Sequence, residues 1–359
     1  MRARFLRFFA GLKLASVLSA ISLVTISAST ALAAESEILV KYFDLTKGRI
    51  AFTYALNGKK EVYVLDFATL VAKPVITSNG DNDSPRFSKD GTKILFTSTR
   101  TGDQEIYVAN SDGTGVKQLT NNKGGDWDPD WSPDGKQIVF MTYRDNAFHL
   151  SVMNHDGTGY EELVKLAEGK EYGCPRWAPT GDEIMYQTTE YWPGIDLLAY
   201  NLKTKRVTVL TTGNLSATRP AFAPDGQTYS YSFGSKEDTD IFLHKRDTSS
   251  KPVAAVTQPG LDLDSEWLQD GKRFLYVSET TPKSGHFEIF LYNVDTRESV
   301  QVTQSDGIIR NLSWTPTSTE SLGKDKPVEK NTMSDATPPD GPPEMFPPPL
   351  PSPSPTPSN

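Results

Sequence analysis

Residue types that commonly build catalytic or structural sites are scarce in this chain of 359 residues. It contains one cysteine, Cys174, and four histidines. A single cysteine excludes an internal disulfide, so the fold must be stable without one even in an oxidising compartment. Gly-x-Ser-x-Gly, His-Glu-x-x-His and phosphate-loop patterns are absent as well, which removes the usual signatures of hydrolases, zinc proteases and nucleotide-binding enzymes. No stretch after the first 33 residues shows convincing helical periodicity.

Positive charge is in deficit. The chain has 37 lysines and arginines against 45 aspartates and glutamates, and a formal net charge of −8. This balance argues against nucleic acid as a partner and against binding to anionic lipid by charge alone. An acidic surface does permit a basic protein partner.

The N-terminus has the three regions of a secretory signal peptide. Four positive residues (Arg2, Arg4, Arg7 and Lys13) precede a mostly apolar run from Leu14 to Ile26, and Ala31-Leu32-Ala33 has the small residues of a cleavage site. We predict that residues 1–33 are removed, which leaves a chain of net charge −12 with no stable membrane insertion, in the periplasm or secreted. The alternative is an uncleaved anchor, because Leu14 to Ala33 is just long enough to span a membrane.

The C-terminus is rich in proline. Twelve prolines lie between Pro327 and Asn359, including the run Pro347-Pro348-Pro349. Proline fixes φ and lacks an amide donor, so this composition favours an extended, solvated chain over strands or helices. We predict that residues 319–359 are a disordered tail and that residues 34–318 form the folded domain.

A repeat of about 45 residues dominates the rest of the chain. One aromatic position recurs at intervals of 44 to 46 residues, at Phe52, Phe96, Phe140, Tyr186, Tyr231 and Tyr276. Nine residues earlier, a second aromatic position is occupied by Phe43, Phe87, Trp131, Trp177, Phe222 and Trp267. Turns such as Ser132-Pro133-Asp134-Gly135 separate runs rich in Val, Ile, Phe and Tyr, four runs to each unit. Four-stranded units at this period predict an all-β fold, a six-bladed β-propeller.

A seventh copy of the first strand decides how the ring closes. The segment Arg310 to Pro316 contains Ser313-Trp314-Thr315-Pro316, which matches Trp131-Ser132-Pro133 better than the region of Phe43 does. We therefore predict that the Trp314 strand pairs with the strands of residues 48–77 and closes the ring, because closure leaves no large open edge. The segment of Phe43 would then lie outside or over the ring.

The repeats resemble a known family. The pattern Pro129-x-Trp131-Ser132-Pro133-Asp134-Gly135, followed by Ile138-Val139-Phe140, resembles the WD40-like repeats of the TolB propeller family, and the resemblance extends from Lys41 to Pro316. The family includes the periplasmic TolB proteins of the Tol–Pal envelope system and the propellers of some peptidases. The resemblance implies a propeller and an envelope-associated binding role. TolB carries an α/β domain before its propeller, whereas only residues 34–47 stand there in this chain.

Residues that recur in every unit are expected to serve the fold. One such position holds Glu61, Glu105, His149, Asp196, Asp240 and Glu288, and we predict that these side chains bind loop amides and hydroxyls. The histidines do not converge on a metal site or a triad, because His149 and His155 lie near opposite faces of one unit, and His244 and His286 fall in other units. We predict that Cys174, which precedes Pro175 and has no histidine beside it in sequence, is an inert, partly buried thiol.

Residues that occur once are candidates for function. In a propeller the loops before the first strand and after the second strand emerge on one face, here called the channel-mouth face. In the third and fourth units these loops bring together aromatic and charged residues, and aromatic residues in surface loops are typical binding anchors. The predicted partner-binding residues are Asp126, Trp127, Asp128, Arg144, Asp145, Glu171, Tyr172, Tyr191 and Trp192. The competing interpretation is that the rings pack beneath their own loops.

We predict no catalytic residue, no metal and no cofactor. Asp81, Asp83, Asp262 and Asp264 could hold Ca²⁺, but they lack the spacing of a calcium loop, which favours solvated turn residues. The leading functional hypothesis is an exported, non-catalytic module that binds an envelope protein with its acidic face, which suits a basic partner. The alternative is a carbohydrate-binding protein or carbohydrate-active enzyme. That enzyme would use Asp126 and Asp128 as acid and base, although two neighbours in one loop seldom flank a glycosidic bond.

Overall fold

The computed structural model describes residues 24–25, 48–165, 171–190, 194–211, 216–246 and 250–316. Side chains at 24–25, 171–172, 189–190 and 194 are outside this description. The predicted cleavage site, Phe43 and the predicted tail from residue 319 also lie outside the described residues. Within them, no helix has the length and apolar character needed to cross a membrane.

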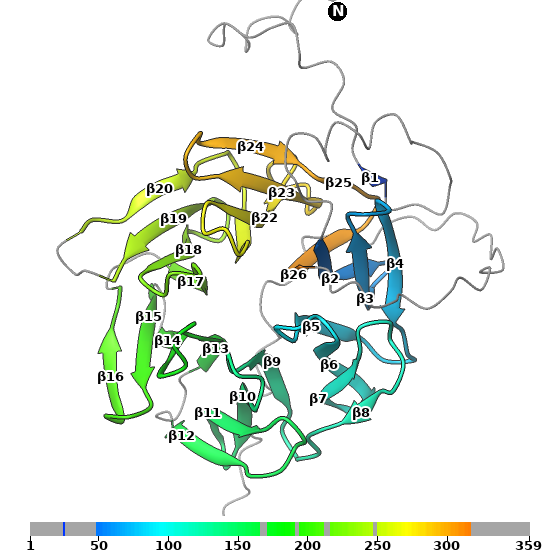
Figure 1. Ribbon diagram of the computed structural model, residues 1–359, viewed down its shortest axis with the longest axis vertical. Coiled ribbons are helices and arrows are strands. Elements are labelled where there is room, and N and C mark those ends of the chain that lie inside the picture. Colours follow the sequence, from blue (N-terminus) through cyan, green and yellow to red (C-terminus); the bar gives the residue numbers. More distant parts are fainter. Residues whose placement is uncertain are drawn as a thin grey trace, which may run out of the picture.

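Four sheets of four antiparallel strands are arranged around a common centre (Figure 1). The first contains β5 (Asn82–Phe87), β6 (Lys93–Thr101), β7 (Asp103–Asn110) and β8 (Lys117–Gln118), and the second β9 (Asp126–Trp131), β10 (Gln137–Arg144), β11 (Ala147–Asn154) and β12 (Glu161–Lys165). The third contains β13 (Glu171–Trp177), β14 (Glu183–Glu190), β15 (Gly194–Asn201) and β16 (Arg206–Val209), and the fourth β17 (Ser216–Phe222), β18 (Thr228–Gly234), β19 (Thr239–Lys245) and β20 (Val253–Val256).

An eight-stranded sheet combines strands from both ends of the folded region. Its members are β21 (Asp262–Trp267), β22 (Arg273–Glu279), β23 (Phe287–Asn293), β24 (Glu298–Gln301), β26 (Ile308–Pro316), β2 (Gly48–Leu56), β3 (Lys59–Asp66) and β4 (Val71–Ile76). A single parallel residue pair, Phe287 with Ile308, joins β23 to β26. The short strand β1 (Val24–Thr25) pairs with β25 (Thr303–Gln304). The structure is therefore an all-β propeller.

The C-terminal strand closes the ring as predicted. Strand β26 pairs antiparallel with β2, from Gly48 opposite Pro316 to Ala55 opposite Ile308. The innermost strands form a complete circuit of contacts: β5 with β9, β9 with β13, β13 with β17, β17 with β21, β21 with β26, and β26 with β5. These six strands enclose the central channel.

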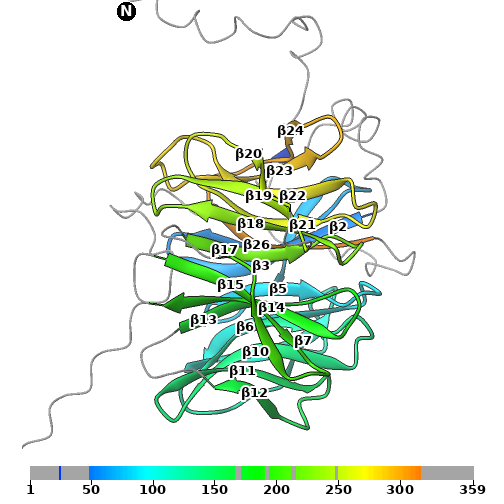
Figure 2. The same ribbon diagram turned by 90° about the vertical axis from the view of Figure 1, so that its left-hand side faces the viewer.

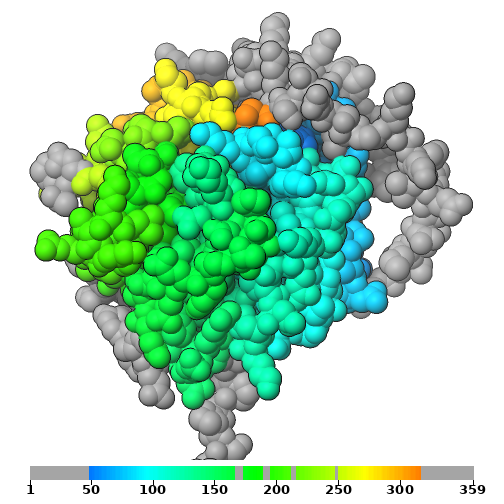
Figure 3. Space-filling model, turned by 60° about the horizontal axis from the view of Figure 1, so that its bottom comes forward, coloured from blue at the N-terminus to red at the C-terminus, as the bar shows by residue number. Residues whose placement is uncertain are grey.

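The hydrophobic core lies between neighbouring sheets rather than in the channel. Seen from the side, successive sheets pack face to face (Figure 2), and each interface holds its own apolar cluster. The recurring aromatics Phe52, Phe96, Phe140, Tyr186 and Tyr276 are fully buried in these clusters, because alternate strand residues face opposite sides of a sheet. In the space-filling view, the sheets coloured cyan and green lie directly against each other (Figure 3).

The repeated turn has a local explanation. The N–H of Gly135 donates to the carbonyl of Ser132 at 2.8 Å, and Gly135 has a φ of 70°, which glycine adopts without strain. The side chain of Asp134 accepts from the hydroxyl of Ser132 at 2.7 Å and from the N–H of Lys136 at 3.1 Å. Each turn thus fixes where a first strand ends and a second begins.

Candidate functional site: the central channel

Every innermost strand carries a bulge at the same place. Six non-glycine residues there have φ between 48° and 55°, and we call them the bulge positions: Ser84, Asp128, Cys174, Arg219, Asp264 and Asn311. The pairing register of each innermost strand shifts around these residues. A bulge turns side chains and amides away from the ladder, here toward the channel.

Side chains of neighbouring sheets bind the amides of the bulge positions. The N–H of Cys174 donates to Asp128 at 3.0 Å, and the N–H of Asn311 donates to Asp264 at 3.0 Å. Gln187 accepts from the N–H of Arg219 at 2.8 Å. These bonds join one sheet to the next, so Asp128 and Asp264 serve the ring as acceptors.

A charged network crosses the channel at this level. Arg219 forms an ion pair with Asp264 and donates to the side-chain oxygen of Asn311 at 3.2 Å. Asn311 donates in turn to Asp83 at 2.7 Å, and Lys60 binds the other oxygen of Asp83 at 2.9 Å. Burial alone would raise the pKa of Asp264, but Arg219 and other donors hold it below its ordinary value. The pKa of Asp83 is lowered in the same way, because the attraction of Lys60 and the hydrogen bonds to Asp83 outweigh the effect of burial.

A second repeated position lies just before the last aromatic of each innermost strand. We call these six residues the capping positions: Arg86, Asp130, Arg176, Ala221, Glu266 and Ser313. Three of them accept the amide of the aromatic in the next innermost strand: Asp130 from Trp177 at 2.9 Å, Glu266 from Trp314 at 3.3 Å, and Ser313 from Phe87 at 2.9 Å. Arg86 reaches Glu266 at 3.2 Å.

A cavity of about 160 Å³ lies within the ring of capping positions. All six capping residues line it together with terminal aromatics of the innermost strands, including Trp177, Phe222, Trp267 and Trp314. Glu266 and Asp130 supply negative charge, and Arg86 and Arg176 supply positive charge. Ala221 contributes no polar side chain to the wall.

Comparison with known proteins identifies the fold family. Residues 27–218 match the family model of the TolB β-propeller domain, which is more than half of the chain. The chain belongs to the TolB β-propeller family.

Individual relatives are distant. The Tol-Pal system protein TolB of Wolinella succinogenes is 23% identical over 138 residues, which are 38% of this chain and 32% of that protein, so the match spans about a third of the relative. The crystal structure of TolB from Acinetobacter baumannii superposes with a TM-score of 0.67 at 18% identity, covering 79% of this chain and 71% of that one. A putative TolB from Agrobacterium tumefaciens gives 0.57 at 14% identity, covering 76% and 99%. These structural similarities establish the fold.

The TolB-like propeller places the predicted partner-binding residues in different environments. Asp126 is fully buried and accepts a hydrogen bond from Asn122 at 2.5 Å. Trp127 is half-buried, with its ring 5.8 Å from that of Phe148. Asp128 is a bulge position that also accepts from the hydroxyl of Ser84 at 3.2 Å. Trp127 therefore packs within its own sheet, against a ring of β11.

The other predicted residues are more exposed or lie beyond the description. Arg144 stacks on Tyr160, with 4.2 Å between its guanidinium carbon and the ring centre, and Asp145 is exposed at the tip of the β10–β11 hairpin. Glu171 and Tyr172 begin β13, and their side chains are outside the description. Tyr191 and Trp192 fall outside the described residues. The binding role of this whole set stays a prediction.

One part of the sequence interpretation is corrected. We expected Gly124 to Asp128 and Glu171 to Gly173 to be loops, but β9 begins at Asp126 and β13 at Glu171. Asp126 lies opposite Thr142, so it belongs to the ladder, where a sheet and its neighbours can cover it. The loops on the channel-mouth face are therefore shorter than their composition suggested.

Two of the recurring carboxylates, Glu105 and Glu288, bind loop hydroxyls and amides as predicted, whereas Glu61 forms an ion pair with Lys59 at 2.8 Å. Glu105 accepts from the hydroxyl of Thr120 at 2.6 Å and from the N–H of Asn122 at 2.9 Å. Glu288 accepts from the N–H of Ser305 at 2.6 Å. His149 occupies the same position and lies 2.7 Å from Glu162. Among the described residues, no three His, Cys, Asp or Glu side chains are grouped to hold a metal ion.

Sequence reasoning missed the bulge and capping positions. The signal was present, because proline follows the bulge position at Pro85, Pro129, Pro175 and Pro220, and the capping residue comes directly after it. Aligning the units on this proline would have revealed two rings of variable, channel-facing residues. Cys174 is one of them; burial and the nearby Asp128 raise the pKa of its thiol, as expected for an inert thiol.

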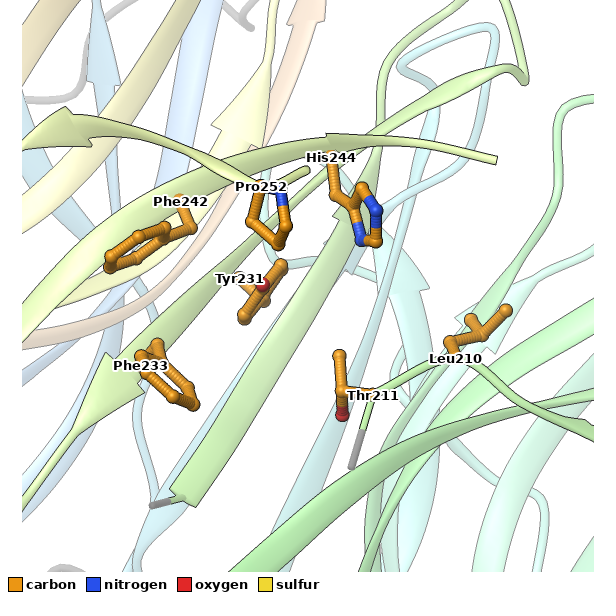
Figure 4. Close-up of a pocket in the computed structure, with 7 residues that line it drawn as sticks. All are labelled: Leu210, Thr211, Tyr231, Phe233, Phe242, His244 and Pro252. Carbon is orange, nitrogen blue, oxygen red and sulfur yellow. The ribbon is translucent and has the colours of Figure 1, made fainter. Parts of the chain in front are cut away.

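A second cavity, of about 260 Å³, lies at the rim between the third and fourth four-stranded sheets (Figure 4). Three aromatic rings line it, and the centroids of Phe233 and Phe242 are 5.4 Å apart. His244 lies at its edge, where Nδ1 is 2.7 Å from the hydroxyl of Tyr229 and Nε2 is 3.0 Å from the carbonyl of Ser250. Both imidazole nitrogens are therefore engaged within the protein.

The channel carboxylates predict a dependence of stability on pH. Burial raises the pKa of Asp130 to about 7, against the opposing effect of Arg86. An acid whose pKa is raised on folding stabilises the protein below its unfolded pKa, and this contribution is lost as pH rises through the folded pKa. The free energy of unfolding should therefore fall between about pH 4 and 7. Asp130→Asn should flatten this slope in urea unfolding measured across the range, leaving the part due to Asp262, whose pKa burial also raises to about 7.

Proposed function

We propose that this TolB-like propeller is a non-catalytic module that binds an envelope protein on its channel-mouth face. The observation that carries the proposal is that the channel carboxylates are engaged in hydrogen bonds to the backbone. Asp128, Asp130, Asp264 and Glu266 each accept a backbone amide from a neighbouring strand of the ring. Carboxylates held in this way support the ring and are poorly placed to exchange protons with a substrate, whereas catalysis requires a free, positioned acid or base.

We also infer that the ring has six blades. The eight-stranded sheet divides at the single pair between Phe287 and Ile308 into β21–β24 and β26-β2-β3-β4. Each half repeats the four-stranded pattern of the other sheets. Six innermost strands and six bulge positions fit this count.

The likeness to TolB supports a periplasmic location, and the N-terminal sequence supports export. We expect envelope-fraction protein to begin at Ala34, because cleavage follows the small residues Ala31 and Ala33. N-terminal sequencing of the purified protein measures this directly. A chain that retains Met1 in the membrane pellet would favour the anchored alternative instead.

The exposed part of the channel-mouth face narrows the docking surface. Asp126 is buried, so it cannot steer a partner, whereas Asp145 is exposed in a tight hairpin where Asp145 and Asn146 both have positive φ. Such a two-residue turn holds its side chains in a defined direction. Tyr143 packs on Phe148 directly beneath this turn, with 5.0 Å between ring centres. We therefore place the docking surface on the β10–β11 hairpin, and we keep Trp192 from the sequence analysis as its expected anchor.

Binding kinetics test this assignment. A partner recovered from envelope extract with the mature, full-length protein should bind the Trp192→Ala variant about 2 kcal/mol more weakly, because a buried interface tryptophan is a typical hot spot. Asp145→Asn should slow association with a basic partner and flatten its salt dependence, with little change in dissociation.

The control substitution lies on the opposite face. Asp112 is exposed in the turn after β7, and Asp112→Asn should leave the kinetics unchanged. Equal affinity for wild type and Trp192→Ala, each with the same melting temperature, would remove this surface from the proposal. Retention of glycan without any protein would point to the carbohydrate-binding alternative.

A further inference from the structure

The caps at the end of the innermost strands are incomplete. Asp130, Glu266 and Ser313 each accept the amide of the next strand's aromatic residue. Arg86, Arg176 and Ala221 stand at the equivalent positions but cannot act as side-chain acceptors, since guanidinium has only donors and alanine has neither. These positions would cap the N–H groups of Trp131, Phe222 and Trp267, and within the described part of the chain no side chain accepts from them. Of these three residues, Phe222 and Trp267 line the cavity.

The backbone register shows where these two amides point. In an antiparallel ladder, residues alternate between hydrogen-bonded pairs and pairs whose amides face away from the partner strand. The N–H of Ala223 donates to Thr228 at 2.8 Å, and that of Leu268 donates to Arg273 at 2.9 Å. Phe222 and Trp267, one residue earlier, therefore direct their amides away from the ladder, as Trp177 does toward Asp130. Both residues line the central cavity.

The charges of the capping positions also differ around the ring. In ring order these residues are Arg86, Asp130, Arg176, Ala221, Glu266 and Ser313. The acidic Asp130 follows Arg86, whereas the uncharged Ala221 follows Arg176. Arg86 has Glu266 within 3.2 Å. Arg176 donates to the carbonyl of Pro175 at 2.9 Å and also lines the cavity. Ala221 therefore supplies no hydrogen-bond acceptor at this place in the cavity wall, although the cation Arg176 and the inward amides of Phe222 and Trp267 are its neighbours.

We propose that this place in the cavity binds the carboxylate of a ligand, which would act there as Asp130 acts in its own strand. One oxygen would accept from the amide of Trp267 or Phe222, and the charge would pair with Arg176. The cavity, at about 160 Å³, exceeds the roughly 30 Å³ that one water occupies, so it can admit a small acid or a single acidic side chain. The aromatic wall of Phe222, Trp267 and Trp314 suits the apolar part of such a ligand.

The two neighbouring acids, Glu266 and Asp130, do not repel a bound carboxylate with two full negative charges. Glu266 is paired with Arg86. Burial raises the pKa of Asp130 to about 7, so that this carboxyl is partly protonated at neutral pH. The site is independent of the docking surface on the channel-mouth face, because the capping positions lie at the opposite ends of the innermost strands.

Titration of tryptophan fluorescence tests the site in the full-length protein, because Trp177, Trp267 and Trp314 line the cavity. Sodium propionate should give a saturable change that sodium chloride at equal ionic strength and propionamide do not. Ala221→Asp supplies the missing cap from within the chain and should weaken propionate binding at least tenfold. Arg176→Gln, which removes the cation, should do the same, and the exposed Arg206→Gln is its matched control.

The outcomes separate the sources of the carboxylate. Tighter binding of propionate than of the peptide acetyl-Ala-Glu-Ala-amide supports a free small acid as the ligand. Tighter binding of the peptide, lost when its Glu is replaced by Gln, supports an acidic side chain of a protein. A response that does not saturate, or one that both cavity variants retain in full, overturns the proposal. If Ala221→Asp does not fold, Arg176→Gln decides between these results.

Discussion

Deletion of residues 308–359 should abolish cooperative folding, whereas deletion of residues 323–359 should leave the melting temperature nearly unchanged. The longer deletion removes β26, which pairs with β2 along its length and contributes the fully buried Ile309 and Leu312. Loss of one such side chain typically costs about 2–5 kcal/mol, and whole domains are stable by only about 5–15 kcal/mol. The deletion also exposes the inner edge of β2.

Thermal unfolding followed by far-UV circular dichroism measures both deletions. The shorter deletion is the control, because it removes only residues beyond the last described strand. If the two truncated proteins melt at the same temperature, β26 does not hold the ring together, and another segment must pair with β2.

The second large effect concerns the ion pair between Arg219 and Asp264. Asp264→Asn should destabilise the protein by about 3–5 kcal/mol, because removing one partner of a buried pair leaves an uncompensated charge. The Asp264 side chain is only 7% exposed, and it also accepts the amide of Asn311. Because its pKa is lowered on folding, this contribution is present above the unfolded pKa and lost as pH falls through the folded pKa. The variant should therefore differ least from wild type at strongly acid pH.

Urea unfolding at pH 7 provides the measurement, and an exposed ion pair provides the control. Lys283 and Glu237 are 2.8 Å apart with side chains 71% and 73% exposed, so Glu237→Gln should leave the free energy of unfolding nearly unchanged. Similar losses for Asp264→Asn and Glu237→Gln would mean that the channel network does not stabilise the ring.

Much of the fold could be predicted from the repeat, for a physical reason. Each pair of neighbouring sheets needs its own apolar core, so aromatics such as Phe96 and Phe140 recur at one spacing, and each unit shows the same pattern of strands. Closure of the ring by the Trp314 strand could also be predicted from the sequence, because a seventh copy of the first strand had to complete the unit that lacked one.

The candidate site was less accessible from the sequence, because composition does not reveal burial. Asp126 and Trp127 looked like loop residues, but two ladder pairs, Trp127 opposite Met141 and Asp126 opposite Thr142, put them at the start of β9. The roles of Asp128 and Asp264 depend on amides 46 and 47 residues away in the chain. Contacts between sheets of this kind follow from the closed ring rather than from local pattern.

The claim that the channel-mouth face binds a protein is tested most directly by photo-crosslinking in cells. Benzoylphenylalanine in place of Asp145 should yield a discrete protein adduct in the envelope, whereas the same residue in place of Asp112, exposed on the opposite face, should yield none. Adducts from Asp112 alone, or from neither position in cells that export the folded protein, would contradict the account.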